Sequence, residues 1–307
     1  MQFKKFVGSR PAAIAGAVLS AAMLAAVSAP ANAATASGDM TEAEMLSVIK
    51  SYADANPTGP EKDSLIIGGA YADIKQYPYM AQIFTQDSKG NGYFCSGSVV
   101  GPKKILTAAH CLAGRDAKKT VVVTGAKHRA DSSSLYGGKL YAASKHWVHP
   151  AYNAKKIDND IAVVTLSKAT AAKPIKTTWS GDTASYKPGT KATALGWGRT
   201  SGKANSPLSP WLKKVDLPIQ SDWTCKNKYW GNTYIKGHMV CAGKPASGSD
   251  AMTNTICNGD SGGPLVVNGR VVGINSFVSG LGCTAKGSYP VFVKYSWYSK
   301  TVAPQIK

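Results

Sequence analysis

Short apolar and β-branched runs, separated at short intervals by Gly, Pro, Asn and Asp, dominate the chain from residue 66 to residue 307. Such runs between turn residues are typical of β-strands. A helical period appears only near the C-terminus, where 295–302 predicts a helix that Pro304 helps to end. The pattern predicts an all-β fold, a sandwich or a pair of barrels. Strands are expected over 79–84, 97–100, 120–123, 161–166, 191–195, 265–267 and 271–276.

The first 33 residues follow a different pattern. Lys4, Lys5 and Arg10 precede an apolar, Ala-rich stretch over 12–27, and Ala31-Asn32-Ala33 has a small-x-small form. This order predicts an export signal over residues 1–33 and a secreted, extracellular protein. A membrane anchor is the alternative. The Ala-rich run and the cleavage pattern directly after it disfavour that alternative, and no later segment is apolar enough to span a bilayer.

Residues 34–65 are polar, lack Cys and contain all three Glu of the chain. Thr41, with Glu44 three residues later, is the pattern of a helix start, so a helix is expected over 41–55. The stretch Asn-Pro-Thr-Gly-Pro at 56–60 then ends the helix and predicts an exposed linker.

Positive charge is concentrated in residues 66–307. Residues 66–307 contain 31 of the 36 Lys+Arg of the chain and 11 of its 17 Asp+Glu, so their net charge is +20. Such a charge favours solubility, or attraction to anionic surfaces. The Lys residues are scattered and no nucleic-acid-binding motif is present, so we expect general basicity without a specific nucleic-acid site.

All six cysteines lie in the same part of the chain. An even number in an exported protein predicts three disulfides, for which the sequence alone permits 15 connectivities. A metal cluster is the alternative, but no Cys-x-x-Cys pair is present and the spacings are long. The cysteines are Cys95, Cys111, Cys225, Cys241, Cys257 and Cys283.

Three stretches carry residues suited to nucleophilic catalysis: Thr-Ala-Ala-His-Cys at 107–111, Asp-Asn-Asp at 158–160, and Cys-Asn-Gly-Asp-Ser-Gly-Gly-Pro at 257–264. A hydroxyl needs a base within hydrogen-bond reach, and that base needs a partner that fixes its tautomer. The glycines next to the serine allow a tight turn whose N–H groups can stabilise an oxyanion. A side chain at Gly259 would obstruct the substrate.

Together these stretches resemble the motifs of the chymotrypsin/trypsin family of serine proteases, in the chain order His, Asp, Ser. Further matches are Gly-Trp-Gly at 196–198, Met-Val-Cys-Ala-Gly at 239–243 and His-Pro-Ala-Tyr-Asn at 149–153, so the resemblance covers nearly all of 66–307. It implies two antiparallel six-stranded β-barrels, an active site in the cleft between them and a short C-terminal helix. It also implies a monomeric endopeptidase that needs no cofactor or metal and meets protein or peptide substrates and protein inhibitors.

The resemblance assigns roles to individual residues. His110 is the general base, Asp160 its orienting partner and Ser261 the nucleophile, and the N–H groups of Gly259 and Ser261 form the oxyanion hole. The disulfides implied are Cys95–Cys111, Cys225–Cys241 and Cys257–Cys283.

The stretch Ile-Ile-Gly-Gly at 66–69 matches the mature N-terminus of the family. Cleavage of the Leu65–Ile66 bond would free an ammonium group on Ile66, which would pair with Asp260 beside the nucleophile. Because a buried carboxylate without a partner is costly, this pair can order the site. The resemblance therefore implies a propeptide over 34–65, a secreted zymogen and a peptidase domain over 66–307.

The expected specificity pocket lacks an acid. Thr255 aligns with the pocket floor, where trypsin-like members carry Asp, and Ile256 is bulky beside it. On the wall, Ser276, Phe277 and Val278 replace the commoner Ser-Trp-Gly, and Val278 narrows the entrance. An apolar P1 residue of small or medium size is expected, because an unpaired ammonium would be costly to bury there.

Three alternatives stay open at this point. Asp250 or another acid could reach the pocket and restore a basic preference. The chain could be a catalytically inactive basic binding module of the same fold. A different hydrolase, such as an esterase, is the third, but the motifs do not resemble the strand–turn–helix elbow of α/β-hydrolases.

Overall fold

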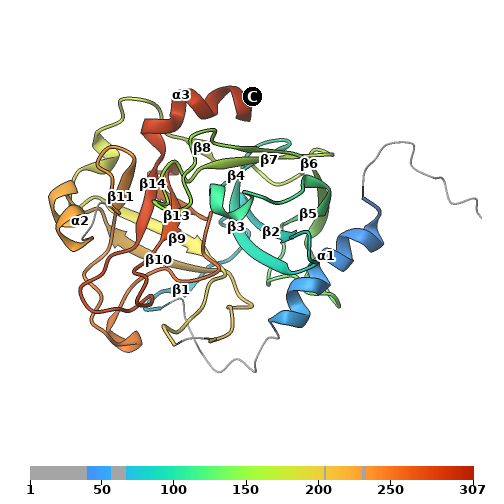
Figure 1. Ribbon diagram of the computed structural model, residues 1–307, viewed down its shortest axis with the longest axis horizontal. Helices are drawn as coiled ribbons and strands as arrows, with labels where there is room; N and C mark the ends of the chain where they lie inside the picture. The colour runs from blue at the N-terminus through green and yellow to red at the C-terminus, as the bar shows by residue number, and fades with distance from the viewer. Residues whose placement is uncertain (1–39, 57–66, 204, 230–232) are drawn as a thin grey trace, which may run out of the picture. The chain divides into compact units, whose positions relative to one another are not determined.

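The computed structural model describes residues 40–56, 67–203, 205–229 and 233–307 (Figure 1). The signal predicted over 1–33, the linker from residue 57 and the Leu65–Ile66 bond lie outside the described residues. Within them the all-β class is confirmed. None of the helices in the described ranges is long and apolar enough to cross a membrane.

The first half of the domain is a closed six-stranded barrel. Its strand order is β2-β3-β4-β7-β6-β5, and every neighbouring pair is antiparallel. Alternate residues of β2 belong to different cores: Ala81 and Ile83 to one, Met80 and Phe84 to the other. Strand β2 is therefore buried on both faces. The strands are β2 (Met80–Gln86), β3 (Gly92–Gly101), β4 (Lys104–Thr107), β5 (Thr120–Thr124), β6 (Lys139–Val148) and β7 (Ala162–Leu166).

The second half is an eight-stranded sheet with the order β1-β10-β9-β12-β13-β14-β11, and β8 pairs with β13. The resemblance implied six strands here. The short edge strands β1 and β8 bring the number to eight. The sheet closes into a barrel where Ile219, just after β10, forms an isolated bridge with Ala242, just after β11. The strands are β1 (Ala70–Tyr71), β8 (Lys176–Thr177), β9 (Lys191–Gly196), β10 (Lys213–Pro218), β11 (Met239–Cys241), β12 (Pro264–Val267), β13 (Arg270–Phe277) and β14 (Val291–Lys294).

Each of the seven expected strands is present. Their ends differ by one or two residues at most, except that β3, expected over 97–100, begins five residues earlier, at Gly92. The longest strand that was not expected is β6, whose middle contains Ala, Ser and Lys and which is partly exposed. Its pairing with β5 and β7 holds it in the sheet despite this weak pattern.

Three α-helices lie in the described ranges, α1 (Glu42–Ala55), α2 (Asp222–Lys228) and α3 (Tyr295–Ile306), with four 3₁₀ turns, η1 (Ala109–Cys111), η2 (Ala117–Lys119), η3 (Ala184–Tyr186) and η4 (Asp250–Met252). Helix α1 begins as expected, with a capping box between Thr41 and Glu44. The expectation that Pro304 helps to end α3 is wrong, since the helix continues to Ile306. Pro304 removes one hydrogen bond of the last turn, while Ile306 packs against the barrel core and holds that turn in place.

Helix α1 packs against the first barrel. Val48, Ile49 and Tyr52 are buried, while Ser47 before them and Lys50 between them are exposed. The buried positions share one face of the helix, and they belong to the same apolar cluster as Met80 of β2.

Candidate active site

His110 lies in the 3₁₀ turn η1, which follows β4 directly. Two contacts fix its position relative to Asp160. The backbone N–H of His110 donates to Asp160 Oδ1 at 2.8 Å, and its Nδ1 lies 2.8 Å from Asp160 Oδ2. A carboxylate only accepts hydrogen bonds, so Nδ1 carries the proton and Nε2 keeps its lone pair. The imidazole is therefore held in the form that a general base needs.

Asp160 is 1% exposed and directly precedes the buried Ile161 and strand β7. Ser276 of β13 donates a further hydrogen bond to its Oδ2 at 2.6 Å, so the second half of the domain supports a carboxylate of the first.

Burial lowers the pKa of His110, but the charge of Asp160 and its hydrogen bond outweigh burial, and the pKa of His110 is raised above the usual 6.5.

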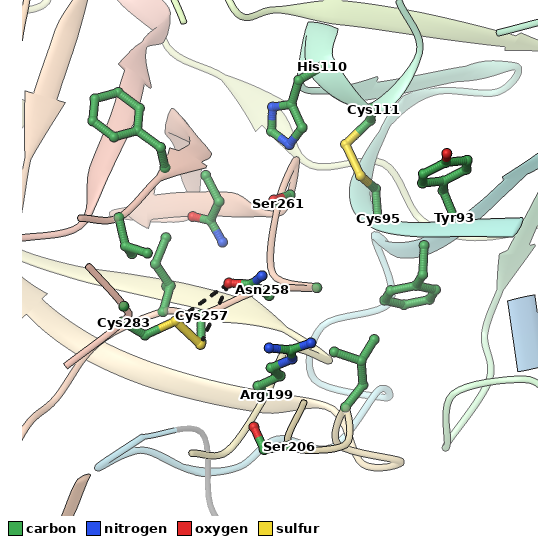
Figure 2. A pocket seen from close by; sticks show the side chains of 18 of the residues that line it. Tyr93, Cys95, His110, Cys111, Arg199, Ser206, Cys257, Asn258, Ser261 and Cys283 are labelled. Atoms are coloured by element: carbon green, nitrogen blue, oxygen red, sulfur yellow. Dashed lines mark hydrogen bonds between the residues drawn. A yellow bond between two sulfur atoms is a disulfide. The ribbon is translucent and has the colours of Figure 1, made fainter. Parts of the chain in front are cut away.

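Ser261 lies in the turn between Cys257 and β12, and this turn is attached to the first barrel. The N–H of Ser96 donates to the carbonyl of Ser261 at 2.8 Å, and the hydroxyl of Ser96 donates to the carbonyl of Gly259 at 3.1 Å. Ser261 and His110 line the same cavity, and Ser261 lies below the imidazole in Figure 2.

Gly259 has a φ of 95°, which favours glycine, and a Cβ there would lie 2.7 Å from Leu208 and 3.0 Å from the Cα of Gly198. The sequence interpretation held that a side chain here would obstruct the substrate. The contacts give a second reason, since the turn packs too closely on the neighbouring loop to admit a side chain.

Asp260 is completely buried beside Ser261. Its carboxylate accepts hydrogen bonds from the N–H groups of Gly198 and Cys257, both at 2.8 Å. Burial raises the pKa of Asp260 to about 7, and the two N–H groups offset this only in part. Ile66, its expected partner, lies outside the described residues, whereas the next residue, Ile67, is buried.

A cavity of about 1360 Å³ contains His110 and Ser261 in its lining. Of the expected pocket residues, Ile256, Ser276, Phe277 and Val278 line it as well. Thr255 is buried next to Ile256, donates its hydroxyl proton to the Ile256 carbonyl at 3.2 Å, and is not among the lining residues.

No Asp or Glu belongs to the described lining of this cavity. Asp250, the acid that could have restored a basic preference, accepts hydrogen bonds from Ser201 Oγ at 2.6 Å and from the Gly202 N–H at 2.9 Å. Its carboxylate is therefore directed to the 201–202 loop.

Three disulfides form in the described residues, Cys95–Cys111, Cys225–Cys241 and Cys257–Cys283. They are the pairs that the resemblance implies. The first joins β3 to the turn that carries His110, and the third ties the Ser261 turn to the pocket wall. His110, Cys95 and Cys111 are close enough to suggest metal ligands, but the two sulfur atoms are bonded to each other and are not thiolates.

The cavity also includes residues that the sequence did not single out. Tyr93, Arg115 and Arg199 line it, and the Arg115 guanidinium lies 3.5 Å from the centroid of the Tyr93 ring. Arg199 directly follows the Gly-Trp-Gly motif, a signal that could have identified it. Tyr52 and Asn56 of the α1 segment line the cavity too, and nothing in their local sequence indicates this.

Asp158 has a contact that its expected role does not include. It was interpreted as a solvated residue or a turn former, and its backbone does pair with that of Asn153 across the turn at 154–157. In addition, its Oδ1 lies 2.7 Å from Nδ1 of His238, and the two side chains are 16% and 24% exposed. The pair joins the loop before Asp160 to the segment before β11. The two residues are 80 positions apart, so the sequence does not show that they meet.

The chain is similar to known proteins over most of its length. A family model described as Trypsin matches residues 66–302. The chain is 36% identical over 241 residues to a trypsin of Saccharopolyspora erythraea, covering 78% of this chain and 98% of the relative. It is 34% identical to cationic trypsin-3 of Rattus norvegicus over 79% of this chain and 92% of the relative, and 32% identical to a trypsin of Sus scrofa over 79% and 98%.

Proposed function

Because the chain belongs to the trypsin family and is a serine endopeptidase, we propose that Ser261 is its nucleophile, His110 its general base and Asp160 the residue that orients His110. The observation that carries this assignment is the two-point contact of His110 with the buried Asp160, at 2.8 Å each. An inactive binding module would not need the tautomer that these contacts fix.

In the proposed reaction, Ser261 Oγ attacks the peptide carbonyl carbon while its proton passes to Nε2 of His110. The carbonyl oxygen becomes an oxyanion, which accepts hydrogen bonds from the N–H groups of Gly259 and Ser261. The C–N bond then breaks, and His110 gives its proton to the departing amine. Water attacks the acyl-enzyme by the same route, with His110 again the base, and the acid product leaves Ser261 free.

We propose that residues 1–33 direct secretion, that 34–65 are a propeptide and that cleavage of Leu65–Ile66 activates the enzyme. The new ammonium of Ile66 would pair with Asp260. The pKa of Asp260 supports this assignment, since burial raises it to about 7 while the carboxylate is held by two neutral N–H donors. A cation in contact would stabilise its charged form.

The proposed P1 preference is an apolar residue of small or medium size. The described lining of the cavity supports it, because Ile256 and Val278 belong to the lining and no acidic side chain does. A preference for Arg or Lys is the alternative, favoured by one observation: the relatives are named trypsins.

The test compares chromogenic peptides that differ only in P1: Arg, Phe, Leu and Ala. We call the protein cleaved at Leu65–Ile66 the cut protein. We expect it to hydrolyse the peptides with Leu or Ala at P1 fastest, and we expect the Ser261→Ala variant to hydrolyse none of them. A strong Arg preference would overturn the pocket assignment.

A chain whose Leu65–Ile66 bond is made uncleavable should be inactive, and full activity in that form would overturn the activation step.

A further inference from the structure

The outer surface of the first barrel carries an apolar area that α1 covers. We call it the docking face. It consists of four buried residues on three neighbouring strands, Phe84, Phe94, Val121 and Val123, which share one apolar cluster with the buried face of α1. A soluble protein that loses the cover of such an area exposes a patch that favours binding of a partner.

Tyr52 is at the centre of this contact. Its ring centroid lies 6.0 Å from that of Phe84 and 5.6 Å from that of Phe94, and the Arg129 guanidinium lies 5.5 Å from the same ring. Such aromatic contacts stabilise more than the buried area alone does. Ile49, one turn earlier, is completely buried.

The barrel accommodates the backbone of the helix closely at Gly92. A Cβ at this position would lie 2.3 Å from the Tyr52 nitrogen and 2.5 Å from the Tyr52 Cα. Gly92 is not one of the glycines with positive φ, so its own backbone does not call for glycine. The close approach of α1 gives a reason for its lack of a side chain.

The charges of the two parts are complementary. Residues 34–65 contain six Asp+Glu and two Lys, a net charge of −4, against +20 for residues 66–307. Residues 34–65 contain no cysteine, so after cleavage at Leu65–Ile66 only non-covalent contacts can hold them to the body.

The helix also reaches the catalytic cavity. Tyr52 and Asn56 line it together with Tyr93, and Tyr52 lies against Gly92 and Phe94, the two neighbours of Tyr93 in the chain. Figure 2 shows Tyr93 and the Cys95–Cys111 disulfide on one side of Ser261. The Cys257–Cys283 disulfide, next to the P1 pocket wall, lies on the other side. Because the scissile bond must lie at Ser261, a substrate with P1 in that pocket would continue past Ser261 to the opposite side, where Tyr93 lies.

We propose that the docking face is a binding site for an acidic amphipathic helix, and that the severed segment 34–65 stays there as a second chain and obstructs the leaving-group side of the cleft. The proposal rests on the cleavage at Leu65–Ile66 that the proposed function includes. Activation by cleavage is then incomplete, and release of the segment becomes a second step that long substrates require.

The severed segment gains its affinity from burial of Val48, Ile49 and Tyr52 and from its charge. Against this, a free helix of 14 residues is only marginally stable in water and must be ordered on binding. We therefore expect reversible binding that weakens with added salt.

The experiment uses the chain from residue 34, with residues 61–65 replaced by an enteropeptidase recognition sequence so that the cut falls before Ile66. After the cut, size-exclusion chromatography at low salt shows whether the segment elutes with the body. A fluorophosphonate label on Ser261 reports separately whether the site is active.

Two substrates test the obstruction. One is a quenched peptide with four residues on each side of the scissile bond, and the other is a peptide p-nitroanilide with the same P residues, whose leaving group is a single ring. With the segment bound, we expect KM for the long peptide to be at least about tenfold higher than after the segment is removed, and KM for the p-nitroanilide to be unchanged.

Matched variants test the contact itself. Tyr52→Ala removes the ring and raises helix propensity, so weaker binding cannot come from a poorer helix. We expect about 30-fold weaker binding of the segment, while Ser47→Ala, on the exposed face, leaves binding unchanged. Gly92→Ala, on the barrel side, should release the segment as well. If Tyr52→Ala prevents folding, synthetic 34–65 peptides with and without the change can compete for the cut wild-type protein.

The outcomes separate the two proposals. A segment that elutes apart from a body labelled at Ser261 overturns the docking and leaves the proposed function standing. A segment that stays bound to a body that is never labelled supports the docking and overturns the proposed function. Equal KM values for the long peptide with and without the segment overturn the obstruction, and equal binding of the Tyr52→Ala and Ser47→Ala segments overturns the assigned contact.

Discussion

Asp260 should make the uncut protein lose stability as the pH rises. In the uncut chain the nitrogen of residue 66 is an amide, so no ammonium is available there. The folded-state pKa of Asp260 is about 7, above the usual 3.8. Between these values the folded state binds more protons than the unfolded state, so the stability is fully present below pH 3.8 and is lost as the pH rises toward 7.

The size of the effect follows from the two pKa values. The interval from 3.8 to about 7, at about 1.4 kcal/mol per pH unit, corresponds to about 4 kcal/mol of unfolding free energy. This is a large share of the 5–15 kcal/mol that is typical of a folded domain.

Urea unfolding of the uncut chain with Ser261→Ala, which prevents self-digestion, measures this free energy from pH 4 to pH 8. The matched protein carries Asp260→Asn in addition. Asn offers one acceptor to the two N–H donors, so it changes stability by a constant amount, and only the pH-dependent difference is informative. We expect the Asp260 protein to lose about 4 kcal/mol relative to the Asn variant across this range.

Two curves that run parallel from pH 4 to pH 8 would refute the reasoning, because Asp260 would then have the same proton affinity in the folded and unfolded chains. In the cut protein, an ammonium paired with Asp260 would lower its pKa, and the pH-dependent loss should shrink.

Three further predictions concern the catalytic residues and the pocket. For the cut protein, kcat/KM should rise as the pH rises through the raised pKa of His110. The Asp160→Asn variant should have a kcat about 10⁴-fold lower, because the tautomer of His110 is no longer fixed. A pH-rate profile measured for both proteins that shows an unchanged kcat in the variant would contradict this. Ser276→Ala removes a 2.6 Å hydrogen bond to the buried Asp160 and should lower kcat/KM by about tenfold or more, measured with a p-nitroanilide; wild-type kinetics would refute a supporting role. Val278→Gly should raise the ratio of kcat/KM for Phe over Ala by about tenfold, and an unchanged ratio would show that Val278 does not limit the pocket.

Much of the fold could be predicted because its signals are local. Strand β2 was predictable because its apolar and β-branched run identifies a strand, whereas the two cores that its alternate residues join are seen only in the fold. The start of α1 was predictable because the capping box joins Thr41 and Glu44, only three residues apart. Strand β6 was missed because its pairing with β5 and β7, rather than its own composition, keeps it extended.

The rest depends on contacts between residues distant in the sequence. Asp158 and His238 meet across the two halves of the domain, and Ser96 holds the Ser261 turn from 165 residues away. Tyr52 looks like an ordinary apolar residue of an amphipathic helix. Only the fold shows that it packs against Phe84 and Phe94 and that it lines the catalytic cavity.

Fluorophosphonate labelling followed by peptide mapping tests the role of Ser261 most directly. In the cut protein, we expect a single adduct on Ser261, much slower labelling in the His110→Ala variant and very slow labelling in the uncut chain. An adduct on another residue, or equal rates in all three proteins, would contradict both the proposed triad and its activation by cleavage.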